Sequence, residues 1–442
     1  MENQKGSLKS TITVSLTNYL DAGSIVAGAS GLTLWQNYLG LTETHLGLLN
    51  AISANCFGAA LGAIIGGRLA DKYGRKAIYT RNMLIYMLGV ATIMLSFNFT
   101  MLLIGFLITG ISVGVGVPAS WTYISETSEA GNRGRNIGIS QLAWSVGPAI
   151  IFLFGWLFSP TGPLGNQVRS LGVFVLQTND AISLDLFGNR LIFFTLFVVA
   201  FIAWLLQRRL SESSEWVELK TQKTVKKQEH SYKELLTNVI NIKSIAFLVG
   251  IYLLWNFVAG AMGFFMPHIY ETAGGLSNET ANFLQMAMWG LTALFSYFGF
   301  ALLADKVNQR LLYAFGTLLG VAAWIVLTYI GITNTIALWA FVILWGVHAG
   351  FGVQAFYALW ASELFHARYR AAAQGFMFFI VRGGAAIWSF VFTSVYASAG
   401  FYTAGTIMVV LIVAALFIGV IWTPNTRGKS LKQISDERYS MN

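Results

Sequence analysis

The sequence is poor in cysteine and in charged side chains. Its 442 residues include one cysteine, Cys56, which excludes an internal disulfide and gives no cysteine spacing for a metal cluster. Only 11% of the residues are charged, whereas soluble domains carry roughly a quarter. Because 55% of the residues are hydrophobic, the composition indicates a protein that uses lipid as its solvent.

The sequence also lacks the motifs of common enzymes. It has no Walker loop, no zinc-ligand spacing and no serine nucleophile elbow between a strand and a helix. We therefore expect no enzymatic activity, no cofactor and no metal. The net charge of +9 would suggest a nucleic acid partner in a soluble protein, but here we expect it to reflect membrane topology.

Apolar segments long enough to cross a bilayer recur along the chain. A crossing needs roughly 20 mostly apolar residues. Twelve such segments are predicted, at residues 12–39, 46–70, 77–97, 99–125, 136–158, 190–209, 243–270, 279–303, 311–330, 335–361, 371–397 and 402–423. The fold class is therefore an all-α integral membrane protein with twelve transmembrane helices, the first of which is too long for a cleaved signal peptide.

The basic residues predict the orientation. With both termini in the cytoplasm, all but three of the 28 Lys and Arg residues fall in cytoplasmic segments, where such residues are retained. The exceptions are Arg169 and Arg190, which fall outside, and Arg382, which falls within a helix. We expect a multi-pass protein of the bacterial cytoplasmic membrane with both termini cytoplasmic.

The chain contains an internal repeat. Leu69-Ala-Asp-Lys72 recurs 234 positions later as Leu303-Ala-Asp-Lys306. The pair Glu126 and Arg133 recurs 237 positions later as Glu363 and Arg370. Two pairs at nearly one offset indicate a six-helix unit used twice, as in carriers whose halves rock around a central site.

The longest polar stretch between two predicted spans separates these halves. We predict an N-terminal six-helix bundle at 1–209, a partly helical cytoplasmic linker at 210–242, and a C-terminal six-helix bundle with a short cytoplasmic tail at 243–442. An outer loop is predicted from Ser159 to Asn189, and the sequence assigns it no task.

Four motifs carry a family resemblance. Gly66-Gly-Arg-Leu-Ala-Asp-Lys-Tyr-Gly-Arg-Lys76 resembles the signature loop of the major facilitator superfamily. Arg209-Leu-Ser-Glu-Ser-Ser-Glu-Trp216, Ser362-Glu-Leu-Phe365 and Pro424-Asn-Thr-Arg-Gly-Lys-Ser-Leu431 resemble motifs of its sugar porter branch. The resemblance implies a monomeric secondary active transporter that moves a sugar, a polyol such as inositol, or a sugar derivative by alternating access in symport with protons.

Charged residues at the predicted cytoplasmic helix ends form a candidate gate. The set comprises Asp71, Arg75, Glu126, Arg133, Arg135, Asp305, Glu363 and Arg370. Ion pairs near the membrane edge are worth on the order of 1 kcal/mol each, so a set of them can bias two conformations. The alternative is that the basic residues only anchor the topology.

Three ionisable residues reach mid-membrane depth, where a charge costs several kcal/mol unless it is paired or hydrated. Asp21 resembles the acidic position of proton-coupled sugar porters, and its alternative role is a structural hydrogen bond. Those porters carry a cation where this chain has Phe106, so Arg382 is predicted either to pair with Asp21 or to bind a substrate carboxylate. His348 is a candidate for proton coupling or a packing residue.

Amides and indoles are the groups expected to bind a polyhydroxylated ring. The predicted substrate-binding residues are Gln36, Gln141, Trp144, Asn256, Gln285, Trp289, Gln354 and Tyr357, with Asn18, Trp35 and His268 also available. Gln141 resembles the sugar-contacting glutamine of the family, but Leu254-Trp255-Asn256 replaces its tandem glutamines and Ala358 replaces a tryptophan. Two alternatives to a sugar carrier stay open, an organic anion carrier and a nutrient sensor that does not transport.

Overall fold

The computed structural model describes residues 2–53, 56–129, 131–212, 216–217, 231–367 and 369–439. Every regular element in these ranges is a helix, as expected when backbone polar groups must be satisfied inside a bilayer. The first half contains α1 (Glu2–Ser30), α2 (Leu32–Leu39), α3 (Glu43–Ile52), α4 (Phe57–Tyr73), α5 (Arg75–Met94), α6 (Phe99–Thr127), α7 (Arg133–Phe158), α8 (Gly165–Leu176) and α9 (Ala181–Gln207).

The remaining helices follow a linker of which residues 213–215 and 218–230 lie outside the described chain. They are α11 (Ser231–Thr237), α12 (Val239–Thr272), α13 (Asn278–Phe295), the π-helix η2 (Ser296–Ala301), α14 (Gln309–Ile330), α15 (Thr335–Phe351), α16 (Val353–Glu363), α17 (Arg370–Ile421) and α18 (Leu431–Tyr439). The predicted linker is helical at α11, and the rest of that prediction falls mostly on residues that are not described.

Eleven helical segments of the described chain are long and apolar enough to cross a membrane. The helix α1 falls short of this apolarity because it carries polar residues such as Thr17, Asn18 and Asp21, which are all buried. It runs inside the bundle against α6, α7 and α9 and is the twelfth span. The prediction of an all-α membrane protein is confirmed.

Two of the predicted spans in the second half contain a break. Gly352 separates α15 from α16, and η2 continues α13 with a π-turn, a feature common near functional sites. The long helix α17 holds two spans that join at Gly400, whose φ of 75° is a backbone conformation suited to glycine.

The predicted start of the sixth span at residue 190 is wrong. The helix α9 begins at Ala181 because the Asp180 carboxylate accepts a hydrogen bond from the Ser183 backbone N–H at 2.9 Å, which caps the helix. Arg190 therefore lies inside a helix rather than in a loop, and its guanidinium packs over the rings of Trp35 and Tyr38.

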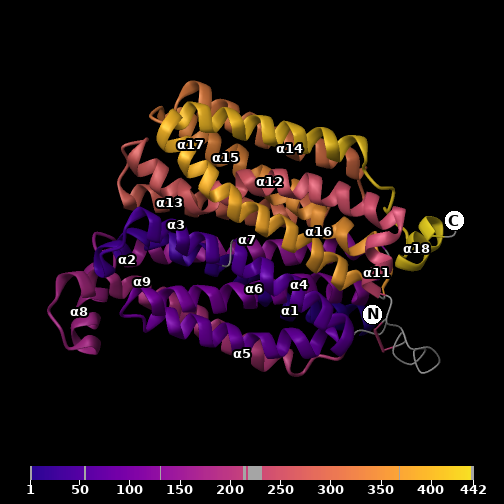
Figure 1. The fold of residues 1–442 in the computed structure, drawn as a ribbon, viewed down its shortest axis with the longest axis horizontal. Helices are drawn as coiled ribbons and strands as arrows, with labels where there is room; N and C mark the ends of the chain where they lie inside the picture. Colours follow the sequence, from indigo (N-terminus) through magenta and orange to yellow (C-terminus); the bar gives the residue numbers. More distant parts are fainter. Residues whose placement is uncertain are drawn as a thin grey trace.

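Figure 1 shows the helices of the first half, in indigo and magenta, beside those of the second half, in orange and yellow. Both chain termini, α11 and α18 lie at one end of the bundle, here called the termini end, while α2, α3 and α8 lie at the opposite end. The halves meet closely where α4 crosses α17, since a Cβ on Gly67 would lie 2.5 Å from the Ala371 carbonyl oxygen.

Candidate functional site

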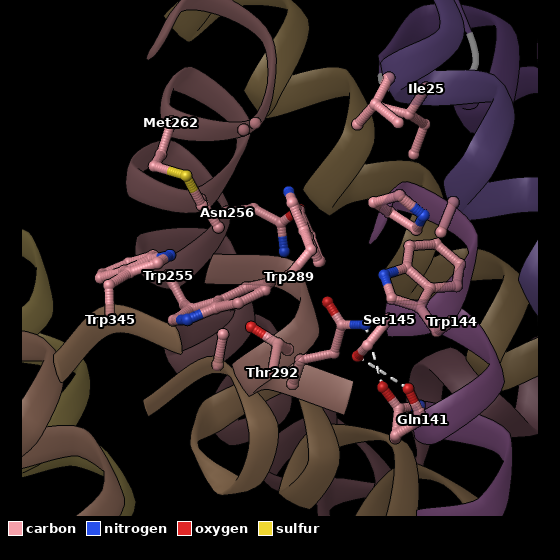
Figure 2. Close-up of a pocket in the computed structure, with 18 of the residues that line it drawn as sticks. Ile25, Gln141, Trp144, Ser145, Trp255, Asn256, Met262, Trp289, Thr292 and Trp345 are labelled. Atoms are coloured by element: carbon pink, nitrogen blue, oxygen red, sulfur yellow. Dashed lines mark hydrogen bonds between the residues drawn. The ribbon is translucent and has the colours of Figure 1, made fainter. Parts of the chain in front are cut away.

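A small central cavity lies between the two halves, near the middle of the bundle. The side chains that line it include Gln141, Trp144 and Ser145 of α7, Trp255 and Asn256 of α12, Trp289 and Thr292 of α13, Gln354 of α16 and Arg382 of α17. Figure 2 shows Gln141 and Trp144 on one side and Trp255, Asn256 and Trp289 on the other. Its volume of about 50 Å³ leaves room for a few water molecules, so the halves are drawn together around it.

Two hydrogen bonds join the halves at the floor of this cavity. The Gln354 side-chain amide donates to the Gln141 side-chain carbonyl at 3.0 Å, and the hydroxyls of Ser145 and Ser296 lie 3.3 Å apart. The Gln141 amide nitrogen has no partner among the described residues. A substrate hydroxyl that enters between the two amides can accept from Gln354 and donate to Gln141, because a hydroxyl both donates and accepts.

Indole rings form much of the remaining wall. Trp144, Trp255, Trp289 and Trp345 all line the cavity, which gives flat apolar faces of the kind that sugar and polyol rings pack against. The indole N–H of Trp289 has no partner among the described residues and is available to a bound solute. Six predicted residues therefore line one cavity, namely Gln141, Trp144, Asn256, Trp289, Gln354 and Arg382.

His348 holds one of these indoles. The Trp255 indole N–H donates to His348 Nε2 at 3.0 Å, and His348 Nδ1 lies 2.8 Å from the Gly316 carbonyl oxygen. Because an indole N–H can only donate, Nε2 is the acceptor and Nδ1 carries the proton. Both ring nitrogens are occupied, which favours the packing alternative for His348 over proton coupling.

Replacement of His348 by Ala is expected to weaken substrate binding without changing its pH dependence. The change leaves the Trp255 N–H unsatisfied, a penalty of about 1–3 kcal/mol, so the KM should rise roughly tenfold. Uptake kinetics between pH 5 and 8 would measure both quantities. A lost or displaced pH profile in His348→Ala would contradict the packing role and restore the proton-coupling alternative.

Asp21 lies at mid-membrane on α1 and is fully buried. Neither carboxyl oxygen has a hydrogen-bond partner within the described chain, so the structural hydrogen bond considered above is not observed. Its Oδ2 faces α6, where a Cβ on Gly116 would lie 3.6 Å away. Arg382 is the cation whose charge reaches Asp21, although no ion pair between them is seen in the described ranges.

Such a carboxyl group is costly as an unpaired anion in an apolar interior, and a bound proton removes that cost. Phe106 carries no charge that could pair with Asp21. Its ring packs beside Gly28, about two turns along α1 from Asp21. The arrangement suits a group that takes up a proton in this state and releases it when the cavity changes shape.

The other predicted binding residues lie elsewhere. Gln36 lines a larger cavity at the opposite end. Gln285 is buried one turn from Trp289, and neither of its amide atoms has a partner among the described residues. Tyr357 is not among the residues that line the cavity, and its ring stacks on that of Tyr252 with 3.8 Å between the ring centroids.

The additional groups behave as packing residues where they are described. Asn18 donates to the Ser140 hydroxyl at 2.8 Å, and the Trp35 indole donates to Asn189 at 2.8 Å. The side chain of His268 lies outside the described residues. Trp255 and Trp345 line the cavity without having been predicted, and only the position of Trp255 beside Asn256 pointed to one of them.

At the termini end, the repeated charges pair across the halves. Arg133 at the start of α7 binds Glu363 at the end of α16 at 2.8 Å. Arg370 at the start of α17 contacts Glu126 at the end of α6 at 3.3 Å. Arg75 adds a second bond to Glu126 at 2.9 Å. These pairs are almost completely buried, so they belong to a closed interface rather than to a hydrated surface.

The two repeated aspartates contact backbone groups of the other half, and Asp71 also pairs with Arg75 of its own half at 3.0 Å. Asp71 accepts from the Ala372 N–H at 2.7 Å, and Asp305 accepts from the N–H groups of Gly134 and Arg135 at 3.1 and 2.9 Å. Each carboxylate thus caps the N-terminus of a helix in the other half, where the helix dipole favours an anion. The Arg135 side chain is exposed, and among the described residues only its backbone N–H takes part in this contact.

Asp305 is shielded by this contact. Burial raises the pKa of its carboxyl group, while the Arg135 and Gly134 N–H donors and the Arg133 charge lower that pKa.

The segment after α9 also contacts the termini end, since Glu212 accepts from the backbone N–H groups of Arg75 and Lys76 at 3.1 Å. We call the set of Asp71, Arg75, Glu126, Arg133, Asp305, Glu363 and Arg370 the charge latch.

The opposite end contains the larger free volume. A cavity of about 580 Å³ is lined there by residues of both halves, among them Gln36, Asn189, Phe264, Glu271 and Phe390. The protein is therefore closed at the termini end by the charge latch and hollow at the other end. Two halves that meet at a central polar cavity, closed on one side, define a membrane carrier with alternating access.

The comparisons with known proteins agree with this class. The family model of the Major Facilitator Superfamily matches residues 12–389. The minor myo-inositol transporter IolF of Bacillus subtilis is 42% identical over 98% of this chain and 94% of its own length. The arabinose-proton symporter of the same organism is 26% identical over 93% of this chain and 90% of that protein.

The solved structure of the proton:xylose symporter XylE from E. coli, bound to 6-bromo-6-deoxy-D-glucose, superimposes with a TM-score of 0.78 at 17% identity, covering 98% of this chain and 99% of that one. The chain belongs to the Major Facilitator Superfamily, and it is a multi-pass membrane transporter rather than an enzyme.

Proposed function

We propose that the protein carries a neutral polyol or sugar across the membrane in symport with protons, and that myo-inositol is the first substrate to test. The observation that carries this proposal is the cavity wall of amides, hydroxyls and indoles, in which Arg382 is the sole ionisable side chain among the lining residues described. The similarity to a myo-inositol transporter over nearly the whole chain supports the same substrate class.

In this mechanism the halves 1–209 and 243–442 rock around the cavity as a monomer in the bacterial cytoplasmic membrane, with both termini in the cytoplasm. The structure then represents a state closed to the cytoplasm, in which substrate enters through the larger cavity. Asp21 takes up a proton in this state, and the charge of Arg382 favours its release once the latch opens. Gln141, Gln354, Asn256 and the indoles hold the ring.

A second candidate is a carrier of an organic anion such as a sugar acid. Arg382 lines the cavity, and its planar guanidinium suits a carboxylate. With a neutral solute, Arg382 can still interact with Asp21, whereas an anionic substrate would pair with Arg382 instead. A sensor that binds but does not transport would show binding without flux.

The proposal predicts saturable uptake of labelled myo-inositol into proteoliposomes when an inward proton gradient is imposed. A protonophore should reduce uptake to equilibration. Gln354→Ala should raise the KM about tenfold, because one lost hydrogen bond with an unsatisfied partner costs on the order of 1–3 kcal/mol. Lys432→Gln, on the exposed face of α18, is the matched control and should behave as the native protein.

Two results would overturn the substrate assignment. Competition by sugar acids but not by neutral sugars or polyols would identify an anion carrier. Binding of myo-inositol without uptake would identify a sensor.

A further inference from the structure

The short helix α8 stands apart from the transmembrane bundle. It connects α7 to α9 at the opposite end, and Figure 1 shows it lying across the direction of the bundle helices. One face packs on α9, since Val168 and Gly172 are buried and a Cβ on Gly172 would lie 3.0 Å from Leu184. Its 12 residues span about 18 Å, which is too short to cross a bilayer.

A second face of α8 is apolar and exposed. Phe174 is 80% exposed, Val175 54% and Leu171 45%. Their spacing of three and four residues places them side by side on the helix. Nothing in the described chain covers them, although burial of such side chains is worth roughly 1.5–3 kcal/mol each in general.

A third face is polar. Asn166, Arg169 and Ser170 are exposed, and Arg169 binds Asp185 of α9 at 3.2 Å. Asn166 and Val175 are nine residues apart, so at 3.6 residues per turn they point to opposite sides of the helix. Val173 lies on the polar side and Gln167 on the apolar side, but the larger apolar side chains gather on one side, as in helices that lie at a membrane surface.

The helix α9, on which α8 packs, has a lipid-facing surface. The outward residues of α9 include Ile182, Phe194, Phe201 and Ile202, each more than two-fifths exposed, as expected for a helix that faces hydrocarbon. Because α8 packs on the first turns of α9, its exposed apolar side chains lie where this apolar surface reaches the membrane boundary.

We propose that α8 is an interfacial helix whose side bearing Leu171, Phe174 and Val175 is inserted into the lipid leaflet at the opposite end. Its polar side faces water, and the Arg169–Asp185 pair holds it to α9. The chain leading into α8 includes Ser159 and Pro160, which line the large cavity. The lipid contact thereby anchors one edge of the cavity entrance to the bilayer.

Spin labels on the full-length protein in lipid nanodiscs test this placement. In a Cys56→Ser background, labels would be attached at Phe174→Cys and Val175→Cys on the apolar side and at Asn166→Cys and Ser170→Cys on the polar side. The first pair should relax several-fold more with oxygen, which partitions into lipid, than with a water-soluble nickel chelate. The second pair should show the reverse preference.

Equal exposure of all four labels to the nickel reagent would overturn the proposal, because α8 would then face water on both sides. Protection of the Phe174 and Val175 labels from both reagents would also overturn it, since a protein surface would then cover them. Correct folding of each variant is checked independently by its transport activity.

Discussion

Asp21→Asn is expected to abolish uphill accumulation of substrate while leaving movement down a gradient intact. Asparagine matches the size of the protonated acid but cannot release a proton, so transport loses its link to the proton gradient. Asp21 is fully buried and unpartnered within the described chain, which leaves no structural hydrogen bond for the substitution to break. Uptake in proteoliposomes should fall to the equilibrium level with or without an imposed pH gradient, and exchange of labelled for unlabelled substrate should persist.

The matched control for this substitution is Asp436→Asn, which removes an exposed carboxylate on α18 and should leave accumulation unchanged. Concentrative uptake by Asp21→Asn at the native level would show that Asp21 does not couple transport to protons. Loss of both accumulation and exchange would show instead that Asp21 is needed for the structure of the protein.

Arg382→Gln separates the two predicted roles of that residue. If Arg382 serves Asp21, the variant should bind neutral polyols and lose much of its accumulation. If it binds a substrate carboxylate, only the sugar acids should lose binding. The distinction matters because Arg382 both lines the cavity and acts on Asp21, so its position alone is compatible with either role.

The repeat in the sequence predicted which charges gather at the termini end, but not which charges meet. An offset shared by Glu126 and Glu363 indicates that they occupy equivalent places in the two halves. It does not reveal that each is bound by the arginine of the other half. The contacts that Asp71 and Asp305 make with the other half were harder to predict, because their partners there are backbone N–H groups and no side-chain pattern marks those.

The depth of a residue in the membrane could be predicted by counting along its helix, whereas the direction of its side chain around the helix axis could not. His348 is fully buried, as its predicted depth implies, and its ring contacts Trp255 and Gly316. Tyr357 likewise lies near the predicted level but stacks on Tyr252. Gln141, which faces the second half from α7, was predicted through a family motif that carries direction as well as depth, whereas Trp144 was predicted only as an available indole.

Glu126→Gln is expected to open the termini end more than any other single change in the charge latch. The Glu126 side chain is fully buried and binds both Arg75 and Arg370, so its neutralisation leaves two buried guanidinium groups with a weakened partner. Loss of one member of a buried ion pair costs about 3–5 kcal/mol, which corresponds to a shift of roughly 10²- to 10⁴-fold in the equilibrium between closed and open forms.

The labelling rate of a cysteine beside the latch would measure this shift. Ser362 is buried in the closed form and adjoins Glu363, so Ser362→Cys in a Cys56→Ser background should react faster with a soluble maleimide when Glu126→Gln is added. Glu437→Gln, in the exposed pair with Lys429, should not change the rate, because exposed pairs contribute little. An unchanged rate in Glu126→Gln would show that the latch does not control closure.

A comparison with Glu363→Gln tests whether the latch is asymmetric. Glu363 is bound by Arg133, and the position equivalent to Arg75 in the second half is Gln309, which accepts from Trp360 instead. The two variants differ by the Arg75 contact, so Glu363→Gln should accelerate labelling at an equivalent site, Ser125→Cys, by a smaller factor. Equal effects would mean that Arg75 serves the fold of the first half, where it also donates to the Ala70 carbonyl oxygen, and adds nothing to closure.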